Sequence, residues 1–392
     1  MFKSKSISLN LTSPLPFLWG TWLIALIICF LDIFTAYPVP SNETIVFILT
    51  FLICSTVAYH YGIRLQPSQK NIRYTGKRLY RAFNILFTLV VFSYIVTIIR
   101  LGLPPLLVGG NRSNYYLSGG GELIYLLIYP CFFLGLFVLY RQSSFKYQRV
   151  LSFQLIILFL IILTRGNKMA IFSVLLMICF FWGRKVNWSF LIILLAMVIL
   201  IFALLSTIYK RNVSNLNNLK AAKIALTGFS LPDSCYFLYD PMIYLSSNIN
   251  NVDSLIQAHM SGLGFGAFSF KGICQLLGII NPVISGLPHQ ALVMANSTLT
   301  VPLFSTYSGL GELYFDFGPV VAIELMMIIS FACGYFNEST RSNLSQSFLA
   351  FLLYQTLTLS FFTFYLGNLE VITNIFVVLV IDKYARQGMD YE

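Results

Sequence analysis

The chain has 392 residues, of which 57% are hydrophobic and only 10% are charged. This composition excludes an ordinary soluble protein, in which about a quarter of the residues carry charge. Apolar runs of about 20 residues recur along the chain, the length that a helix needs to cross a hydrocarbon core of about 30 Å. The sequence therefore predicts an all-α polytopic membrane protein.

The chain begins with a basic segment, followed by an apolar run that is too long for the core of a cleavable signal peptide. We interpret this run as the first of about ten membrane-spanning helices. The predicted spans are 16–37, 43–62, 82–101, 122–140, 149–164, 168–183, 188–209, 316–336, 346–366 and 369–384.

These spans divide the chain into three parts. Residues 1–209 hold the first seven helices with basic cytoplasmic loops, and residues 316–392 hold the last three. Between them, residues 210–315 are polar, rich in Asn and interrupted by Gly and Pro. We interpret this part as a long extracytoplasmic loop of short helices at the membrane interface, because a loop of this length is usually functional.

The basic residues indicate the orientation of the chain. If both chain ends are cytoplasmic, most of the 25 Lys and Arg residues fall on the cytoplasmic side, as the positive-inside rule requires. The net charge of +11 therefore does not call for a nucleic acid partner. We interpret the basic cluster within residues 64–81 as a topology signal, reinforced by anionic lipid, rather than as a partner site.

The cysteines and histidines predict neither a metal nor another cofactor, because their spacing matches no metal site. Five of the seven cysteines lie within predicted spans, where they pack as small hydrophobic side chains. Cys235 and Cys274 share the long outer loop, where an oxidising compartment could join them. The sequence leaves that disulfide open.

Two basic residues interrupt the apolar stretch ILTRGNKMAIF at 162–172. Only about 22 Å of helix separates Arg149 from Arg165, which is short for a 30 Å core. We therefore expect the turn below the outer surface, with Arg165 and Lys168 facing a recessed aqueous cavity. The alternative is that both residues cap a tight hairpin and extend outward, and it is stronger for Lys168.

Further arginines occur at the same predicted membrane level. Arg100 ends the third span, Arg112 lies in a Gly-rich turn, and Arg211 follows the seventh span. Guanidinium groups bind phosphate through two parallel hydrogen bonds. Together with Arg165, these residues suggest a site for a lipid-linked phosphate or pyrophosphate.

The end of the outer loop supplies candidates for a proton acceptor. His289 can titrate near neutral pH, although a loop histidine is often only solvated. Glu312 and Asp316 lie at positions i and i+4, on one helical face. They could act as a base or accept sugar hydroxyls, or they could cap the helix N-terminus.

Four segments resemble the bacterial O-antigen polymerases, the Wzy-type oligosaccharide repeat-unit polymerases. They are RLGLPPLLVGGNRSNYY, LTRGNKMAIF, the long outer loop with its late histidine, and GLGELYFDFGPVVAIELMMIISFACGY. The resemblance implies a glycosyltransferase-C-like enzyme in the bacterial inner membrane, acting in lipopolysaccharide biosynthesis. Such an enzyme transfers a growing glycan from undecaprenyl pyrophosphate to an incoming repeat unit on a second carrier lipid.

The resemblance also implies roles for individual residues. His289 or Glu312 would accept the proton of the attacking hydroxyl. The residues that would bind pyrophosphate or sugar are Arg100, Arg112, Arg165, Lys168, Arg211 and Tyr314. The implied partners are an undecaprenyl-pyrophosphate-linked oligosaccharide, the lipid bilayer and a chain-length regulator protein.

Two other functions compete with a polymerase. An O-antigen ligase, which moves finished glycan onto the lipid A core, shares the layout and the arginine argument. A flippase or transporter would show internal repeats in two matching halves. The predicted spans instead divide unevenly around one large outer loop, which favours the enzymes.

Overall fold

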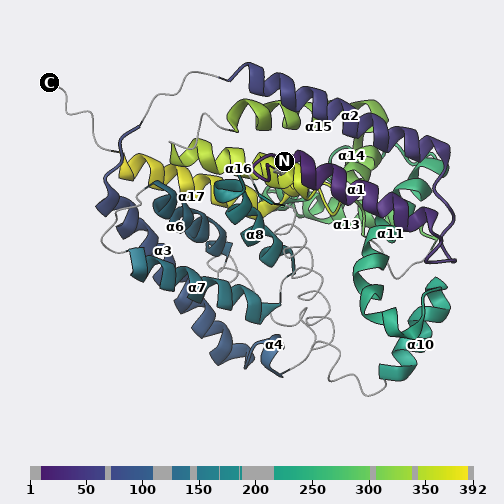
Figure 1. Cartoon of the computed structure of the whole chain (residues 1–392), viewed down its shortest axis with the longest axis horizontal. Helices are drawn as coiled ribbons and strands as arrows, with labels where there is room; N and C mark the ends of the chain where they lie inside the picture. The colour runs from purple at the N-terminus through teal and green to yellow at the C-terminus, as the bar shows by residue number, and fades with distance from the viewer. Residues whose placement is uncertain are drawn as a thin grey trace, which may run out of the picture.

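The computed structural model describes residues 10–66, 72–108, 126–141, 148–166, 168–184, 186–187, 216–300, 306–337 and 343–386. Every regular element within these ranges is a helix, and they contain no β-strand (Figure 1). The helical fold class is therefore confirmed, and the apolar helices are those of a helical membrane protein.

Within the described ranges, four helices are long and apolar enough to cross a membrane. They are α2 (Asn42–Arg64), α3 (Gly76–Leu101), α7 (Gln148–Arg165) and α15 (Pro319–Phe336). Shorter helices overlap other predicted spans: α1 (Leu15–Phe30), α6 (Ile128–Arg141), α8 (Lys168–Trp182), α16 (Leu344–Thr358) and α17 (Leu369–Ala385). The predicted span at 188–209 lies outside the described residues.

The turn between α7 and α8 falls where the sequence places it. α7 ends at Arg165, and α8 begins at Lys168 after Gly166, whose φ of 66° lies in the left-handed region that favours glycine. α8 has 15 residues and is therefore about 22 Å long. Lys168 is the first residue of α8.

The segment between residues 216 and 317 folds into a series of helices. They are α10 (Leu216–Thr227), the 3₁₀-helix η2 (Asp233–Leu238), α11 (Tyr239–Gln257), α12 (Lys271–Leu277), α13 (Pro282–Asn296) and α14 (Gly309–Phe317). α14 starts at Ser308, whose hydroxyl accepts a 3.0 Å hydrogen bond from the N–H of Gly311. It stops at Gly318, where φ is 84°.

One helix of this segment is largely covered by other parts of the protein. α11 has 19 residues, and all of residues 246–253 are buried. Asp253 can be buried because it accepts hydrogen bonds from the hydroxyl of Thr44 at 2.7 Å and the N–H of Ser41 at 3.0 Å. These bonds attach α11 to the start of α2, and α11 also packs on α1.

The helices that support the candidate site pack through aromatic and small side chains. Phe133 of α6 contacts rings of α8 and α16, namely Phe181 at 5.2 Å and Phe348 at 5.0 Å between centroids. Gln355 of α16 donates a 2.7 Å hydrogen bond to Ser173 of α8. This bond holds α8 against α16 at Ser173, about one helical turn after Met169, which lines the candidate site.

α2 and α15 lie side by side at one edge of the molecule (Figure 1). Their backbones approach closely because glycine occupies the contact on both helices. A Cβ atom at Gly334 would lie 2.1 Å from the carbonyl oxygen of Tyr59, and one at Gly62 would lie 2.2 Å from that of Phe331. Small residues at such contacts are typical of helix pairs in membranes.

Candidate functional site

A cavity of about 680 Å³ lies where α8, α11, α12, α13, α14 and the chain after α16 meet. The lysine, histidine and acidic residues among its described lining residues are Lys168, Lys271, His289 and Glu312. Aromatic rings, among them Phe172, Tyr307 and Phe362, form much of the remaining wall. The volume is typical of small-molecule sites, and the few polar groups converge on it from separate parts of the chain.

Glu312 is the buried carboxyl group of the cavity, with 4% of its surface exposed. Its Oε1 accepts a 2.9 Å hydrogen bond from the hydroxyl of Thr363, and its Oε2 accepts one of 3.1 Å from the N–H of Phe364. Burial raises the pKa of Glu312 to about 7, against the opposing effect of the Lys271 charge and the two hydrogen bonds. Its proton is therefore exchangeable near neutral pH.

Lys271 contributes a cation that we did not select from the sequence. Its Nζ lies 3.4 Å from the hydroxyl of Thr363, the same hydroxyl that donates to Glu312. Lys271 opens α12, and the next residue, Gly272, packs so closely that a Cβ there would lie 2.2 Å from the N of Leu369. This contact with the start of α17 sets the position of Lys271.

Lys168 and His289 come from the segments that the sequence predicted. Lys168 reaches the cavity from the first residue of α8, and its Nζ lies 5.9 Å from the ring centroid of Tyr244. His289 lies on α13 directly after Pro288, and it is largely exposed although it lines the cavity. We therefore place His289 at the opening and Glu312 in the interior.

Within the described residues, the side-chain polar atoms of Asn248 and Thr306, both in the wall, have no hydrogen-bond partner. Asn248 is 1% exposed, and neither Oδ1 nor Nδ2 of its amide is bonded. The hydroxyl of Thr306 is likewise buried without a partner. Leaving a buried polar group unsatisfied costs about 1–3 kcal/mol, so a ligand that offers donors and acceptors here would remove that cost.

The arginines that we predicted as phosphate ligands and that the structure describes do not line the cavity, unlike Lys168 and Lys271. Arg165 is 4% exposed at the end of α7, Arg100 is exposed at the end of α3, and neither lines the cavity. A 2.7 Å hydrogen bond between Tyr94 and Thr164 joins α3 to α7 near both arginines. Arg112 and Arg211 lie outside the described residues, so the gathering of four guanidinium groups remains a prediction.

The other candidates of the α14 segment lie away from the cavity. Tyr314 is buried, and its ring packs edge-on against Phe47 with centroids 5.5 Å apart. Asp316 accepts hydrogen bonds from the N–H groups of Phe268 at 3.2 Å and Ser269 at 2.6 Å. Although they share one helical face in the sequence, Glu312 and Asp316 thus serve different surroundings, and only Glu312 lines the cavity.

Cys235 and Cys274, whose pairing the sequence leaves open, are both free thiols. Within the described ranges, no group of three or more His, Cys, Asp or Glu residues could hold a metal ion.

Comparison with known proteins gives no relative: no family model matches the chain, and no curated protein or solved structure matches it. The likeness to O-antigen polymerases therefore rests on the sequence motifs alone.

Proposed function

We propose that the chain is a membrane glycosyltransferase of the O-antigen polymerase type. It would act at the outer face of the bacterial inner membrane and transfer a growing glycan from undecaprenyl pyrophosphate to an incoming lipid-linked repeat unit. The observation that carries this proposal is the gathering of Lys168, Lys271, His289 and Glu312 around one cavity. All four residues lie in the segments that resemble the polymerases or in their long outer loop.

The first requirement of the reaction is a proton acceptor for the attacking hydroxyl. The Glu312 carboxylate is the better placed candidate, because its pKa of about 7 lets it accept a proton without remaining protonated at neutral pH. His289, at the opening, is the second candidate. As the acceptor oxygen loses its proton, it forms a bond to the anomeric carbon of the donor glycan.

The second requirement is stabilisation of the leaving group. The bond between the anomeric carbon and the pyrophosphate oxygen breaks, and the electron pair stays with the pyrophosphate. Ammonium groups fixed in a site of low dielectric constant stabilise such developing charge without a metal. Lys168 and Lys271 line the cavity from opposite parts of the chain and are the candidates for this role.

The third requirement is recognition of the sugars. The aromatic rings of the wall offer flat apolar faces of the kind on which sugar rings stack, and Asn248 and Thr306 offer unsatisfied donors and acceptors for hydroxyl groups. A cavity with cations, aromatic faces and neutral polar atoms fits a glycosyl pyrophosphate better than it fits a purely apolar lipid.

Complementation of a knockout strain, analysed on a gel of surface glycans, tests the proposal. We expect E312Q and K271M to yield lipid A core with single repeat units, whereas K220M should restore long chains. Lys220 is a suitable control because it lies in the same outer segment but pairs with Asp233, at 3.0 Å and far from the cavity lining. R165K tests the arginine prediction in the same assay, since lysine keeps the charge but loses the bidentate geometry.

The same gel, together with the lipid-linked repeats of the two membrane faces, separates the competing functions. Loss of even single repeat units from the surface of E312Q cells would identify a ligase if the lipid-linked repeats accumulate on the outer face, and a flippase if they accumulate on the cytoplasmic face. Long glycan ladders from normally expressed E312Q and K271M would rule out the proposed site.

A further inference from the structure

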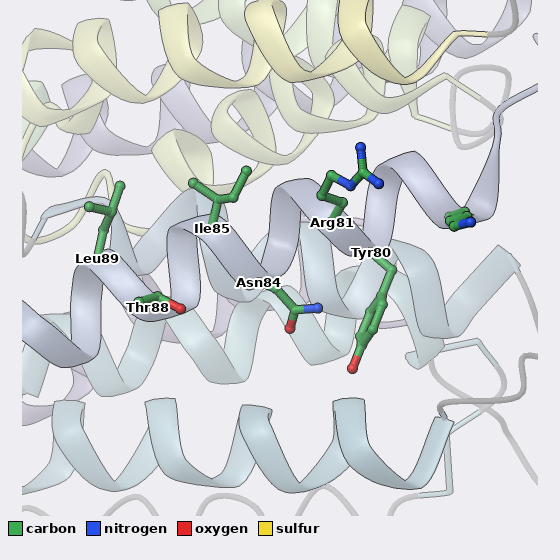
Figure 2. Close-up of a pocket in the computed structure, with 7 residues that line it drawn as sticks. Tyr80, Arg81, Asn84, Ile85, Thr88 and Leu89 are labelled. Atoms are coloured by element: carbon green, nitrogen blue, oxygen red, sulfur yellow. The ribbon is translucent and has the colours of Figure 1, made fainter.

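A second hollow lies along α3, outside the candidate active site. It has a volume of about 550 Å³, and the described residues that line it all belong to this one helix (Figure 2). They form two rows, and within each row successive residues are four positions apart in the sequence. One row is Lys77, Arg81, Ile85 and Leu89, and the other is Tyr80, Asn84 and Thr88.

The rows point to different sides of α3, so a groove runs between them along the helix surface. In Figure 2, Arg81, Ile85 and Leu89 lie on one side, and Tyr80, Asn84 and Thr88 lie on the other. Rows at this spacing form the ridges against which another chain normally packs. In this face of α3, Ile85 and Leu89 are 55% and 39% exposed.

The polarity of the groove changes along its length. Lys77 and Arg81 occupy the first two turns, while Ile85 and Leu89 follow in the next two. From Lys77 to Leu89 the helix rises about 18 Å, slightly more than half of a 30 Å hydrocarbon core. α3 as a whole is about 39 Å long, so its cationic turns extend into the headgroup region when its apolar part spans the core.

The two cations of the groove are available to a ligand. Lys77 and Arg81 are exposed, and neither forms an ion pair with any residue that the structure describes. Arg78, the basic residue between them, is instead engaged within the protein. Its guanidinium donates to the carbonyl oxygens of Tyr384 at 3.4 Å and Arg386 at 3.2 Å.

We propose that this groove binds an anionic phospholipid of the surrounding bilayer. The phosphate lies between Lys77 and Arg81, and one acyl chain lies along Ile85 and Leu89. Charge complementarity at one end, apolar exposure at the other and a length of one lipid monolayer support this occupant. In the topology predicted from the basic residues, the groove faces the inner leaflet, where anionic lipids attract basic residues.

Native mass spectrometry of the full-length protein in detergent tests the proposal. The protein is titrated with phosphatidylglycerol or with phosphatidylcholine that carries the same acyl chains. We expect one tight phosphatidylglycerol adduct, which K77Q/R81Q binds about 25-fold more weakly, because each basic residue near an anionic surface contributes about 1 kcal/mol. I85W, which fills the apolar half of the groove, should lose the same adduct.

R64Q is the matched control. Arg64 is exposed at the end of α2, and only the short stretch 65–75 separates it from α3, so it lies at the same end of the helices. An equal loss in R64Q would assign the attraction to general surface charge and overturn the proposal. An equal loss of phosphatidylcholine, or displacement of the adduct by equimolar undecaprenyl phosphate, would overturn it as well. The Tm without lipid should match that of the wild type in all three variants.

Discussion

The hydroxyl of Thr363 links Glu312 to Lys271 in the cavity, although Thr363 is far from both residues in the sequence. Its hydroxyl donates a 2.9 Å hydrogen bond to Glu312 and lies 3.4 Å from the Nζ of Lys271. The hydroxyl can donate to only one group, so its lone pairs remain for the ammonium. Glu312 and Lys271 are therefore coupled through one side chain, and the predictions below use that coupling.

The ionisation of Glu312 should govern both activity and stability. We expect the wild-type transfer rate to rise with pH through about 7, since only the carboxylate can accept the proton. E312Q should lose this dependence and be 10²- to 10⁴-fold slower, as is typical when a general base is removed. The rate of polymer formation by purified protein from lipid-linked repeat units, measured across pH 5–9, provides the test. An E312Q profile that still rises through pH 7 would assign the base to another group, with His289 as the next candidate.

The stability of the wild-type protein should change with pH in the opposite sense to its transfer rate. The pKa of Glu312 is about 7 in the folded protein against 4.5 as its ordinary value, so the folded state binds more protons between these values. This contribution is complete below pH 4.5 and is lost as pH rises through 7, by up to about 3 kcal/mol. The Tm of the wild type in detergent should therefore fall relative to that of E312Q between pH 4.5 and 8. Parallel Tm curves would contradict the raised pKa.

Lys271 and Lys168 should differ in their effect on this titration. The Lys271 charge lowers the pKa of Glu312, so K271M should shift the midpoint of the pH–rate profile upward. Lys168 lies at the ring of Tyr244, so K168M should mainly weaken substrate binding and shift the midpoint less than K271M does. The pH–rate profiles of the two variants, with KM determined at each pH, distinguish the roles. Equal midpoints in the two variants would show that Lys271 does not act on the base.

The parts of the site that could be predicted are those set by local sequence. The turn at Gly166 separates two apolar helices, so the position of Lys168 follows from the spacing of charges and apolar residues. His289 and Glu312 stand in motifs whose order resembles a known family. For these residues, the structure adds which of them meet: Lys168, His289 and Glu312 line one cavity, whereas Tyr314 packs against Phe47.

The parts that could not be predicted depend on contacts between distant segments. Lys271 reaches the cavity because Gly272 packs on the start of α17, almost a hundred residues later. α11 has a polar sequence typical of an interfacial helix, yet it is buried because Ser41 and Thr44 satisfy Asp253. Asn248 enters the cavity wall through this burial. The pattern of hydrophobic residues along the sequence does not predict such contacts, because they form between segments that meet only in the folded chain.

The unsatisfied amide of Asn248 should make the empty cavity less stable than it could be. N248L replaces a buried polar group that has no partner by an apolar one of similar size, so we expect a higher Tm without substrate. The same variant should bind the glycan substrate more weakly, since the amide is proposed to meet sugar hydroxyls. N250L is the matched control on α11, because Asn250 donates a 3.0 Å hydrogen bond to the carbonyl oxygen of Ser246 and should lose stability. A lower Tm in N248L would show that its amide is satisfied within the protein.

The packing of α2 against α15 should depend on how closely the two backbones can approach each other at Gly62 and Gly334. G334A would place a methyl group 2.1 Å from the carbonyl oxygen of Tyr59, which cannot turn aside, so the helices must separate. We expect a loss of about 1–3 kcal/mol, measured as a lower Tm in detergent. G20A in α1 is the control: its methyl group would meet nothing within 4 Å, and the helix should be as stable or more so. Because G62A would force the same separation, G62A/G334A should cost less than the two single changes together. Additive losses would mean that the two glycines relieve independent contacts.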